Sequence, residues 1–250
     1  MSKIVLEGEN VMKEKAKTFG FETLENRELM AADIRFDAQS GTLSIVGTSA
    51  ADTVQLNAYT TNTMDIWVNR SYMRLNPNAV RAITMDLGAG NDRVEINGIM
   101  KNQLNPNTVD IKLGTGVNES VWIELGSAKR INIDAIASRA TNVGINASVT
   151  DRIFVDMGSD SDTGADKLRL YSSDINRLEA RMGGGNDVIE VLFSTIQTAN
   201  VSMGAGNDKV VTSGGDGYIG SGTIDGGTGT DTIDPLFKNR GRRFERVWSW

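Results

Sequence analysis

Acidic residues recur at intervals along this 250-residue chain, and they are the side chains whose type and spacing could do chemistry. Each follows a short, mostly glycine-rich segment, and successive members are 40, 27, 47, 21, 21 and 23 residues apart. The chain has no histidine and no cysteine, which removes the usual general base, thiol catalysis and most transition-metal sites. The binding of hard cations by oxygen ligands remains possible. The recurring residues are Asp52, Asp92, Glu119, Asp166, Asp187, Asp208 and Asp231.

Charge is unevenly distributed along the chain. The formal net charge is −6, yet residues 238–250 alone carry +4, so the rest carries −10. An acidic body disfavours nucleic acid and anionic membranes as partners. No apolar run approaches the roughly 18 residues of a membrane-spanning helix, so we expect a chain that does not span a membrane.

The segments that flank the acidic residues alternate between apolar and polar residues, as β-strands with one buried face do. A rung of 21–27 residues cannot bury its own inward face, but stacked rungs bury one another. The sequence therefore predicts an all-β fold, a parallel β-helix (β-solenoid). Two residues after the acidic position stand Val54, Val94, Val121, Leu168, Ile189, Val210 and Ile233.

The two long intervals suggest that some rungs have lost the motif. We expect a degenerate rung near residues 64–76 and another near residues 131–148, which together with the seven motif-bearing rungs gives about nine. The alternative is an antiparallel sandwich with decorative turns. That fold gives no reason for one turn motif to recur in the same register.

Four turns are nearly identical: LGAGND (87–92), MGGGND (182–187), MGAGND (203–208) and GGTGTD (226–231). They resemble the haemolysin-type (RTX-like) nonapeptide calcium repeat, G-G-x-G-x-D-x-U-x, of secreted bacterial proteins. The resemblance implies that stacked turns bind Ca²⁺ through carboxylates and glycine carbonyls. The ligand candidates that it implies are Asp92, Asp187, Asp208, Asp231, Gly183, Gly185, Gly204, Gly206, Gly227 and Gly229.

This chain departs from the family in having one such turn per rung, so we expect calcium along one edge only. A second candidate cluster is Asp160, Asp162 and Asp166, where an insertion changes the turn. Alternatively, each Asp or Asn hydrogen-bonds its own turn. Carboxylates stacked about 5 Å apart repel one another, however, unless a cation or hydrogen-bond donors intervene.

The amino-terminal stretch FGFETLENRELMAAD (19–33) resembles the F-E-x-L-E-x-R-x-L-L-A-A-D motif near the start of many planctomycete surface and exported proteins. Met30 stands where leucine is usual. The resemblance implies a role in export or anchoring. The alternative is a charged helical cap, and no apolar stretch typical of a conventional signal peptide is present.

We expect three regions: residues 1–33 for export, anchoring or capping, with helical or irregular structure; residues 34–236 as the solenoid; and residues 237–250 as a basic, aromatic C-terminal cap or assembly tail. The expected function is that of a non-catalytic structural protein, extracellular or at the cell surface. Its expected partners are further copies, in a homo-oligomer or filament, and cell-envelope polysaccharide.

Two other functions stay open. One is a polysaccharide-active β-helix enzyme (a lyase, epimerase or hydrolase), which is disfavoured because no pair of carboxylates stands apart from the repeat. The other is a surface adhesin that binds carbohydrate. Trp67, Tyr72 and Trp122 would be its platform if they projected outward, although we expect Trp67 to fill the core.

Overall fold

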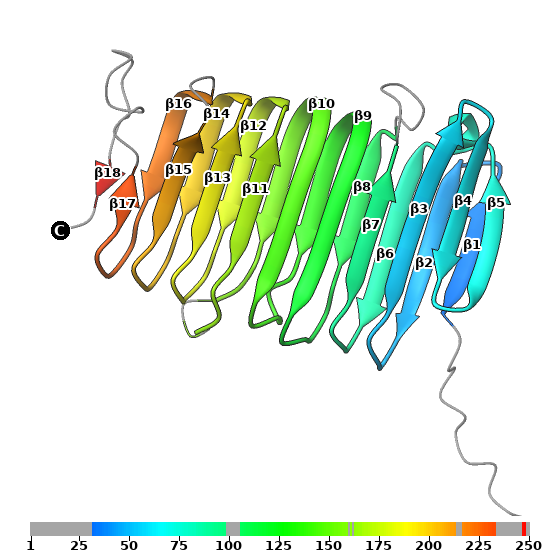
Figure 1. The fold of residues 1–250 in the computed structure, drawn as a ribbon, viewed down its shortest axis with the longest axis horizontal. Helices are drawn as coiled ribbons and strands as arrows, with labels where there is room; N and C mark the ends of the chain where they lie inside the picture. Colours follow the sequence, from blue (N-terminus) through cyan, green and yellow to red (C-terminus); the bar gives the residue numbers. More distant parts are fainter. Residues whose placement is uncertain are drawn as a thin grey trace, which may run out of the picture.

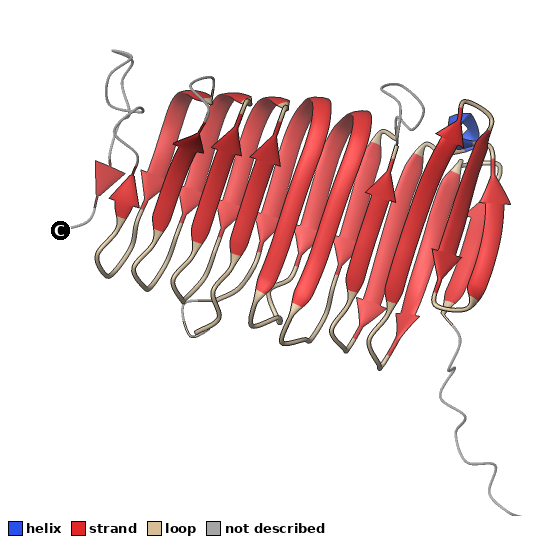
Figure 2. Cartoon of the chain, in the orientation of Figure 1, coloured by secondary structure: helices blue, strands red, loops and turns tan. Residues whose placement is uncertain are grey.

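The computed structural model describes residues 32–98, 106–159, 161, 163–213, 217–233 and 247–248. Its strands coil into a rod of stacked rungs with blue N-terminal strands at one end and red C-terminal strands at the other (Figure 1). The predicted all-β parallel solenoid is confirmed. Strands and tight turns make up almost all of the described chain, and the single short helix is the 3₁₀ turn Pro77–Ala79 (Figure 2).

Two parallel ladders of strands, here called face A and face B, enclose the core. Face A comprises β2 (Thr42–Thr48), β6 (Ala82–Gly88), β8 (Thr108–Lys112), the second halves of β9 (Glu119–Asp134) and β10 (Thr141–Asp156), β12 (Asp174–Arg181), β14 (Thr195–Ser202), β16 (Tyr218–Asp225) and β18 (Val247–Trp248). Face B comprises β3 (Thr53–Thr60), β7 (Arg93–Asn97), the first halves of β9 and β10, β11 (Lys167–Tyr171), β13 (Val188–Leu192), β15 (Lys209–Ser213) and β17 (Thr232–Ile233).

Alternate residues of both faces point inward and form columns that run along the rod. Because the strands pair in register, Val54 stacks on Val94, which stacks on Val121, and all three are buried. The columns beside the glycine turns are also buried, as the alternation in the sequence predicted. Their members are Leu87, Leu113, Met157, Met182 and Met203.

The two edges of the rod reverse the chain by different means. At the glycine edge, a turn carries the chain from face A to face B. At the opposite edge, here called the serine edge, β9 and β10 continue without a break, whereas later rungs use Ser173 and Ser194. The Ser194 hydroxyl oxygen accepts a hydrogen bond from the Ser173 amide over 3.1 Å, and the Ser173 hydroxyl accepts one from Ala147 over 3.0 Å.

The N-terminal end of the rod is antiparallel. The strand β1 (Asp33–Asp37) pairs antiparallel with β2, and the hairpin of β4 (Thr63–Val68) and β5 (Ser71–Leu75) extends face B from β3. The rung predicted near residues 64–76 is therefore wrong, because these residues extend the sheet sideways. The segment 131–148 does belong to the coil, through β9 and β10. The predicted count of nine rungs is not confirmed.

The predicted terminal regions lie almost wholly outside the described residues. Of residues 1–33 only Ala32 and Asp33 are described, and of residues 237–250 only the backbone of β18, so the predicted C-terminal cap is not confirmed. Within the described part of the chain, no helix is long and apolar enough to cross a membrane.

Candidate functional site

The recurring acidic residues lie in one column on the glycine edge, here called the acidic ladder. The strand registers place them in the order Asp52, Asp92, Glu119, Thr141, Asp166, Asp187, Asp208 and Asp231. Thr141 occupies the place of the acid in the rung that lacks the motif, between two runs of carboxylates. All except the half-buried Asp231 are buried.

Every carboxylate of the ladder after Asp52 accepts a hydrogen bond from the backbone amide of the ladder residue one rung earlier. The side chain thereby joins two rungs at a point where the strands have ended. The donor-to-acceptor distances are 2.8 Å from Asp52 to Asp92, 3.1 Å from Asp92 to Glu119, 2.5 Å from Thr141 to Asp166, 2.8 Å from Asp166 to Asp187, 2.8 Å from Asp187 to Asp208 and 3.0 Å from Asp208 to Asp231.

The ladder ends differently at Asp52, because the described part of the chain contains no earlier rung whose backbone amide could donate to it. Its carboxylate accepts hydrogen bonds from the Thr48 amide over 2.7 Å and from the Asn69 side-chain amide over 2.5 Å. Asn69 has a φ of 54° and sits in the turn between β4 and β5. The antiparallel hairpin therefore supplies the donor that closes this end of the ladder.

The turn glycines allow rungs to approach closely. A Cβ atom on Gly206, whose φ is 149°, would lie 1.4 Å from the Gly185 carbonyl oxygen of the previous rung. The Gly204 position is equally tight, at 1.6 Å from the Gly183 oxygen. Of the carbonyls that the resemblance nominated, those of Gly183 and Gly204 already accept backbone hydrogen bonds from the next rung.

The second carboxylate oxygen of several ladder residues is buried without a hydrogen-bond partner in the described structure: Asp92 Oδ2, Glu119 Oε1, Asp208 Oδ2 and Asp231 Oδ2. Burial raises the pKa of Asp92 to about 6 and the pKa of Glu119 to about 7, and repulsion from the preceding carboxylate adds to both. Burial also raises the pKa of Asp208. A proton or a cation would compensate the buried charge at the oxygens of Asp92, Glu119 and Asp208.

Calcium fits these oxygens in donor chemistry. Asp208 and Asp231, which lie on consecutive rungs, would supply anionic oxygens, and calcium takes six to eight oxygen ligands in a tolerant geometry. No group of three or more acidic side chains gathers at one point among the described residues, because each rung contributes only one. Backbone carbonyls and water would have to complete the coordination.

The structure thus brings together Asp166, Asp187, Asp208 and Asp231 in one unbroken run, and it places Asp92 in a separate run with Asp52 and Glu119. The nominated glycines all lie in the turns beside the longer run. Asp160 and Asp162 lie outside the described residues, so the second candidate cluster contributes only Asp166.

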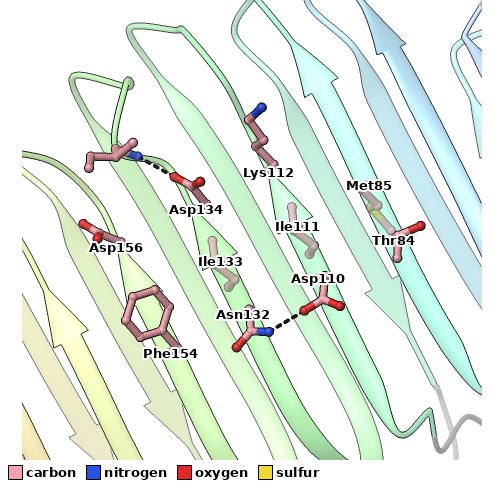
Figure 3. Close-up of a pocket in the computed structure, with 11 residues that line it drawn as sticks. Thr84, Met85, Asp110, Ile111, Lys112, Asn132, Ile133, Asp134, Phe154 and Asp156 are labelled. Atoms are coloured by element: carbon pink, nitrogen blue, oxygen red, sulfur yellow. Dashed lines mark hydrogen bonds between the residues drawn. The ribbon is translucent and has the colours of Figure 1, made fainter.

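A cavity of about 420 Å³ on the outside of face A contains a pair of carboxylates that sequence reasoning missed (Figure 3). Asp134 and Asp156 lie in register on neighbouring strands, at the last position of β9 and of β10. Burial raises the pKa of Asp156, and Arg181, which donates to its Oδ2 over 3.2 Å, opposes the rise. The Asp134 carboxylate accepts a hydrogen bond from the Ile136 backbone amide over 3.2 Å.

A signal for this pair did exist in the sequence. The residue two positions before the first glycine of each turn, or before the equivalent position, faces outward on face A. It is acidic in the rungs of β9 and β10, where it is Asp134 and Asp156. The same position holds Lys112 in the preceding rung and Arg181 in the following one, so the pair is flanked by basic residues. The pattern was masked because the 131–148 rung lacks the glycine motif that marks the register.

Comparisons with protein family models, with curated proteins and with solved structures find no match to this chain, so the ladder and the cavity are interpreted from their own geometry.

Proposed function

We propose that this chain is a non-catalytic structural protein, a calcium-stabilised β-solenoid that self-assembles or anchors at a bacterial cell surface. One observation carries the proposal. The acidic residues, which are the recurring chemically competent groups of the sequence, are buried and hydrogen-bonded to the backbone of the neighbouring rung. A carboxylate used in this way holds rungs together and is not positioned to attack a substrate.

The surface location rests on two resemblances. The glycine turns resemble a repeat of secreted bacterial proteins, and residues 19–33 resemble a motif of exported planctomycete proteins. Calcium is abundant outside cells, where modules with dissociation constants of about 10⁻⁴–10⁻³ M are common. The buried oxygens of Asp208 and Asp231 would be neutralised there by calcium, which supports an extracellular rod better than an intracellular one.

Thermal unfolding in chelator and in calcium tests the proposal. We expect calcium at 100 times its dissociation constant to stabilise the fold by about 2.7 kcal/mol per site. The variant Asp208→Asn with Asp231→Asn should lose this increment, whereas Asp86→Asn, on the exposed side of face A, should keep it. Equal melting temperatures with and without calcium, together with no bound metal by elemental analysis, would contradict the calcium site.

Electron microscopy of the purified protein with and without calcium tests the structural role. We expect rods that join into filaments or lattices when calcium is present. Separate particles at every protein concentration would contradict self-assembly. Magnesium at the same concentration is the control for ionic strength, because it dehydrates reluctantly and demands a stricter octahedral geometry.

A polysaccharide-active enzyme is the second candidate, and the cavity of Figure 3 is the observation that favours it. Asp134 and Asp156 lie on neighbouring strands whose backbones are roughly 5 Å apart. Pairs of carboxylates at such spacing can act as acid and base or as nucleophile and acid. Turnover of a neutral or uronic polysaccharide that is abolished by both Asp134→Asn and Asp156→Asn, with the fold intact, would establish this alternative.

A further inference from the structure

Three aromatic side chains lie in a single line across the outside of face B. The registers place Tyr72 of β5 beside Trp67 of β4, and the same line passes through Gln55 and Glu95 to Trp122 of β9. All of these positions share one face of the sheet because they pair directly. Trp67 and Trp122 are three strands apart, or roughly 14 Å.

The first two aromatic rings are open to solvent. Trp67 is 44% exposed and Tyr72 is 46% exposed, with ring centroids 4.4 Å apart. The expectation that Trp67 fills the core is therefore wrong, because the antiparallel β4 places alternate residues Met64, Ile66 and Val68 inward instead. Exposed aromatic surface of this kind has no role in the core of the solenoid.

The third ring, that of Trp122, is positioned differently, because the residue beside it on the next strand has no side chain. It pairs with Gly144 of β10, and a Cβ atom on that glycine would lie 2.1 Å from Cε3 of the indole. The indole therefore lies over the backbone of the neighbouring rung. This glycine is in neither a turn nor a positive-φ conformation, so its lack of a side chain serves the position of the ring.

A second line of side chains, displaced by two residues from the aromatic line on each strand, is wholly polar. Its members in register are Arg74, Asp65, Asn57, Asn97, Glu124 and Asn146. These side chains are exposed or half-buried, and the line lies roughly 7 Å from the aromatic line. A flat strip thus presents ring faces along one side and planar amide, carboxylate and guanidinium groups along the other.

The charges of the strip are largely balanced. Arg74 donates to both oxygens of Asp65 over 2.6 and 3.1 Å, and the Tyr72 hydroxyl donates to Asp65 Oδ1 over 2.8 Å. Glu95 pairs with Arg93 and accepts a hydrogen bond from Gln55 over 3.1 Å. A strip with paired charges offers little attraction to a polyanion, and it offers oriented donors and acceptors to a neutral partner.

We propose that this strip binds a neutral linear polysaccharide, which lies across the strands along the length of the rod. The apolar C–H faces of sugar rings would pack on Tyr72, Trp67 and Trp122, while their hydroxyl groups would hydrogen-bond the polar line. The inference names the partner of the surface protein proposed above, and it rests on that function only for the source of the glycan.

Intrinsic tryptophan fluorescence and affinity electrophoresis with neutral β-linked glucan, xylan, mannan and chitin oligosaccharides test the proposal. We expect at least one chain of four or more sugars to bind and its monosaccharide not to bind. Trp67→Ala with Trp122→Ala should weaken binding by about tenfold or more, because the double change removes two of the three rings on which the sugars would pack. Gly144→Ala, which displaces the indole without removing it, should also weaken binding.

The half-buried Tyr218 of β16 provides the aromatic control and Asn200 of β14 provides the polar one, and both lie on face A. Tyr218→Ala and Asn200→Ala should leave glycan binding unchanged, whereas Asn97→Ala should weaken it. Absence of binding to every neutral glycan, binding to uronic polymers alone, or equal losses in the control variants would overturn the proposal. Filament formation is measured on the same variants: assembly without glycan binding would overturn this inference alone, and binding without assembly would overturn only the structural role.

Discussion

The acidic ladder places a carboxylate in the core of nearly every rung, where an unpaired charge would be strongly destabilising. One oxygen of each is compensated by an amide, so the side chain replaces the strand pairing that stops at the turn. The other oxygen of Asp92, Glu119, Asp208 and Asp231 is not compensated by a hydrogen bond. The column therefore joins neighbouring rungs, and its uncompensated oxygens are where a proton or the proposed calcium ion would act.

Replacing Asp208 separates these two contributions. Asp208→Ala leaves the buried amide of Asp187 without its acceptor and should lower the free energy of unfolding by about 1–3 kcal/mol. Asp208→Asn keeps a carbonyl oxygen for this amide and should cost less. Urea unfolding followed by circular dichroism measures both. Equal losses in the two variants would contradict the hydrogen-bond interpretation.

The ladder also predicts a pH dependence. The folded-state pKa of Glu119 is raised to about 7, above that of an unfolded chain, so the folded state favours the protonated acid. This contribution to stability is complete below about pH 4 and is lost as the pH rises through about 7. In chelator, the melting temperature should therefore fall between pH 5 and pH 8. Asp92, with a pKa of about 6, acts in the same direction.

The variant Glu119→Gln should reduce this dependence on pH, because glutamine cannot ionise and still offers an acceptor to the Asp92 amide. Asp86→Asn, at an exposed position, serves as the control and should keep the dependence of the parent chain. A melting temperature that is constant or rises from pH 5 to pH 8 would contradict the prediction.

At the scale of elements, the two edges of the rod use different residues because they reverse the chain in different ways. The glycine edge stacks turn backbones so closely that a Cβ atom would collide with the previous rung. The serine edge tolerates side chains, and its turns place Ser172 and Phe193 at φ values of 48° and 50°. Hydroxyl groups of the following serines then bridge the rungs.

Gly206→Ala tests the glycine edge. The added Cβ would lie 1.4 Å from a backbone oxygen at a φ of 149°, so the turn must open and the two adjoining rungs must separate. We expect a loss of more than about 3 kcal/mol in the free energy of unfolding. Ala205 lies in the same turn and already carries a Cβ atom, so Ala205→Ser should lower the free energy of unfolding by less than about 1 kcal/mol. Comparable stability of the two variants would contradict the packing argument.

At the scale of the whole molecule, a solenoid must deal with the unpaired strands at its two ends. The N-terminal end is closed by antiparallel strands, β1 on face A and the β4–β5 hairpin on face B. At the C-terminal end, β17 has two residues and β18 adds two more beside β16. Among the described residues, the parallel pairings are thus shortest at the C-terminal end of the rod.

Deleting residues 238–250 tests whether the tail is an assembly contact. Of the pairings that the structure describes, the deletion removes that of β18 with Ile224 and Asp225, and we expect the rod to remain folded. If the tail docks on another copy, sedimentation should show oligomers for the full chain with calcium and monomers for the deletion. The alternative is that the tail caps its own end.

A chain in which residues 238–250 are replaced by a Gly/Ser segment of equal length is the control for loss of mass and of the free terminus. A monomeric full chain at high concentration with calcium, or unfolding of both variants, would contradict the assembly contact. Oligomers that persist after the deletion would place the contact elsewhere.

The parallel coil could be predicted from the amino-acid sequence alone. Inward residues such as Val94 and Val121 must recur at one position of every rung because neighbouring rungs bury one another, and this requirement leaves a periodic trace. The acidic position marks the repeat for the same reason. The acidic residues that align in the sequence repeats from Asp166 to Asp231 also lie on neighbouring rungs in the ladder.

Features that depend on the direction in which a strand runs could be found only in the folded chain. Residues 64–76 alternate as a rung would, but a strand that returns antiparallel has the same periodicity of two as one that continues the coil. The Asp134–Asp156 pair and the aromatic line from Tyr72 to Trp122 join residues that are distant in sequence. Their proximity comes from the register between strands, and the pattern within one strand carries no information about it.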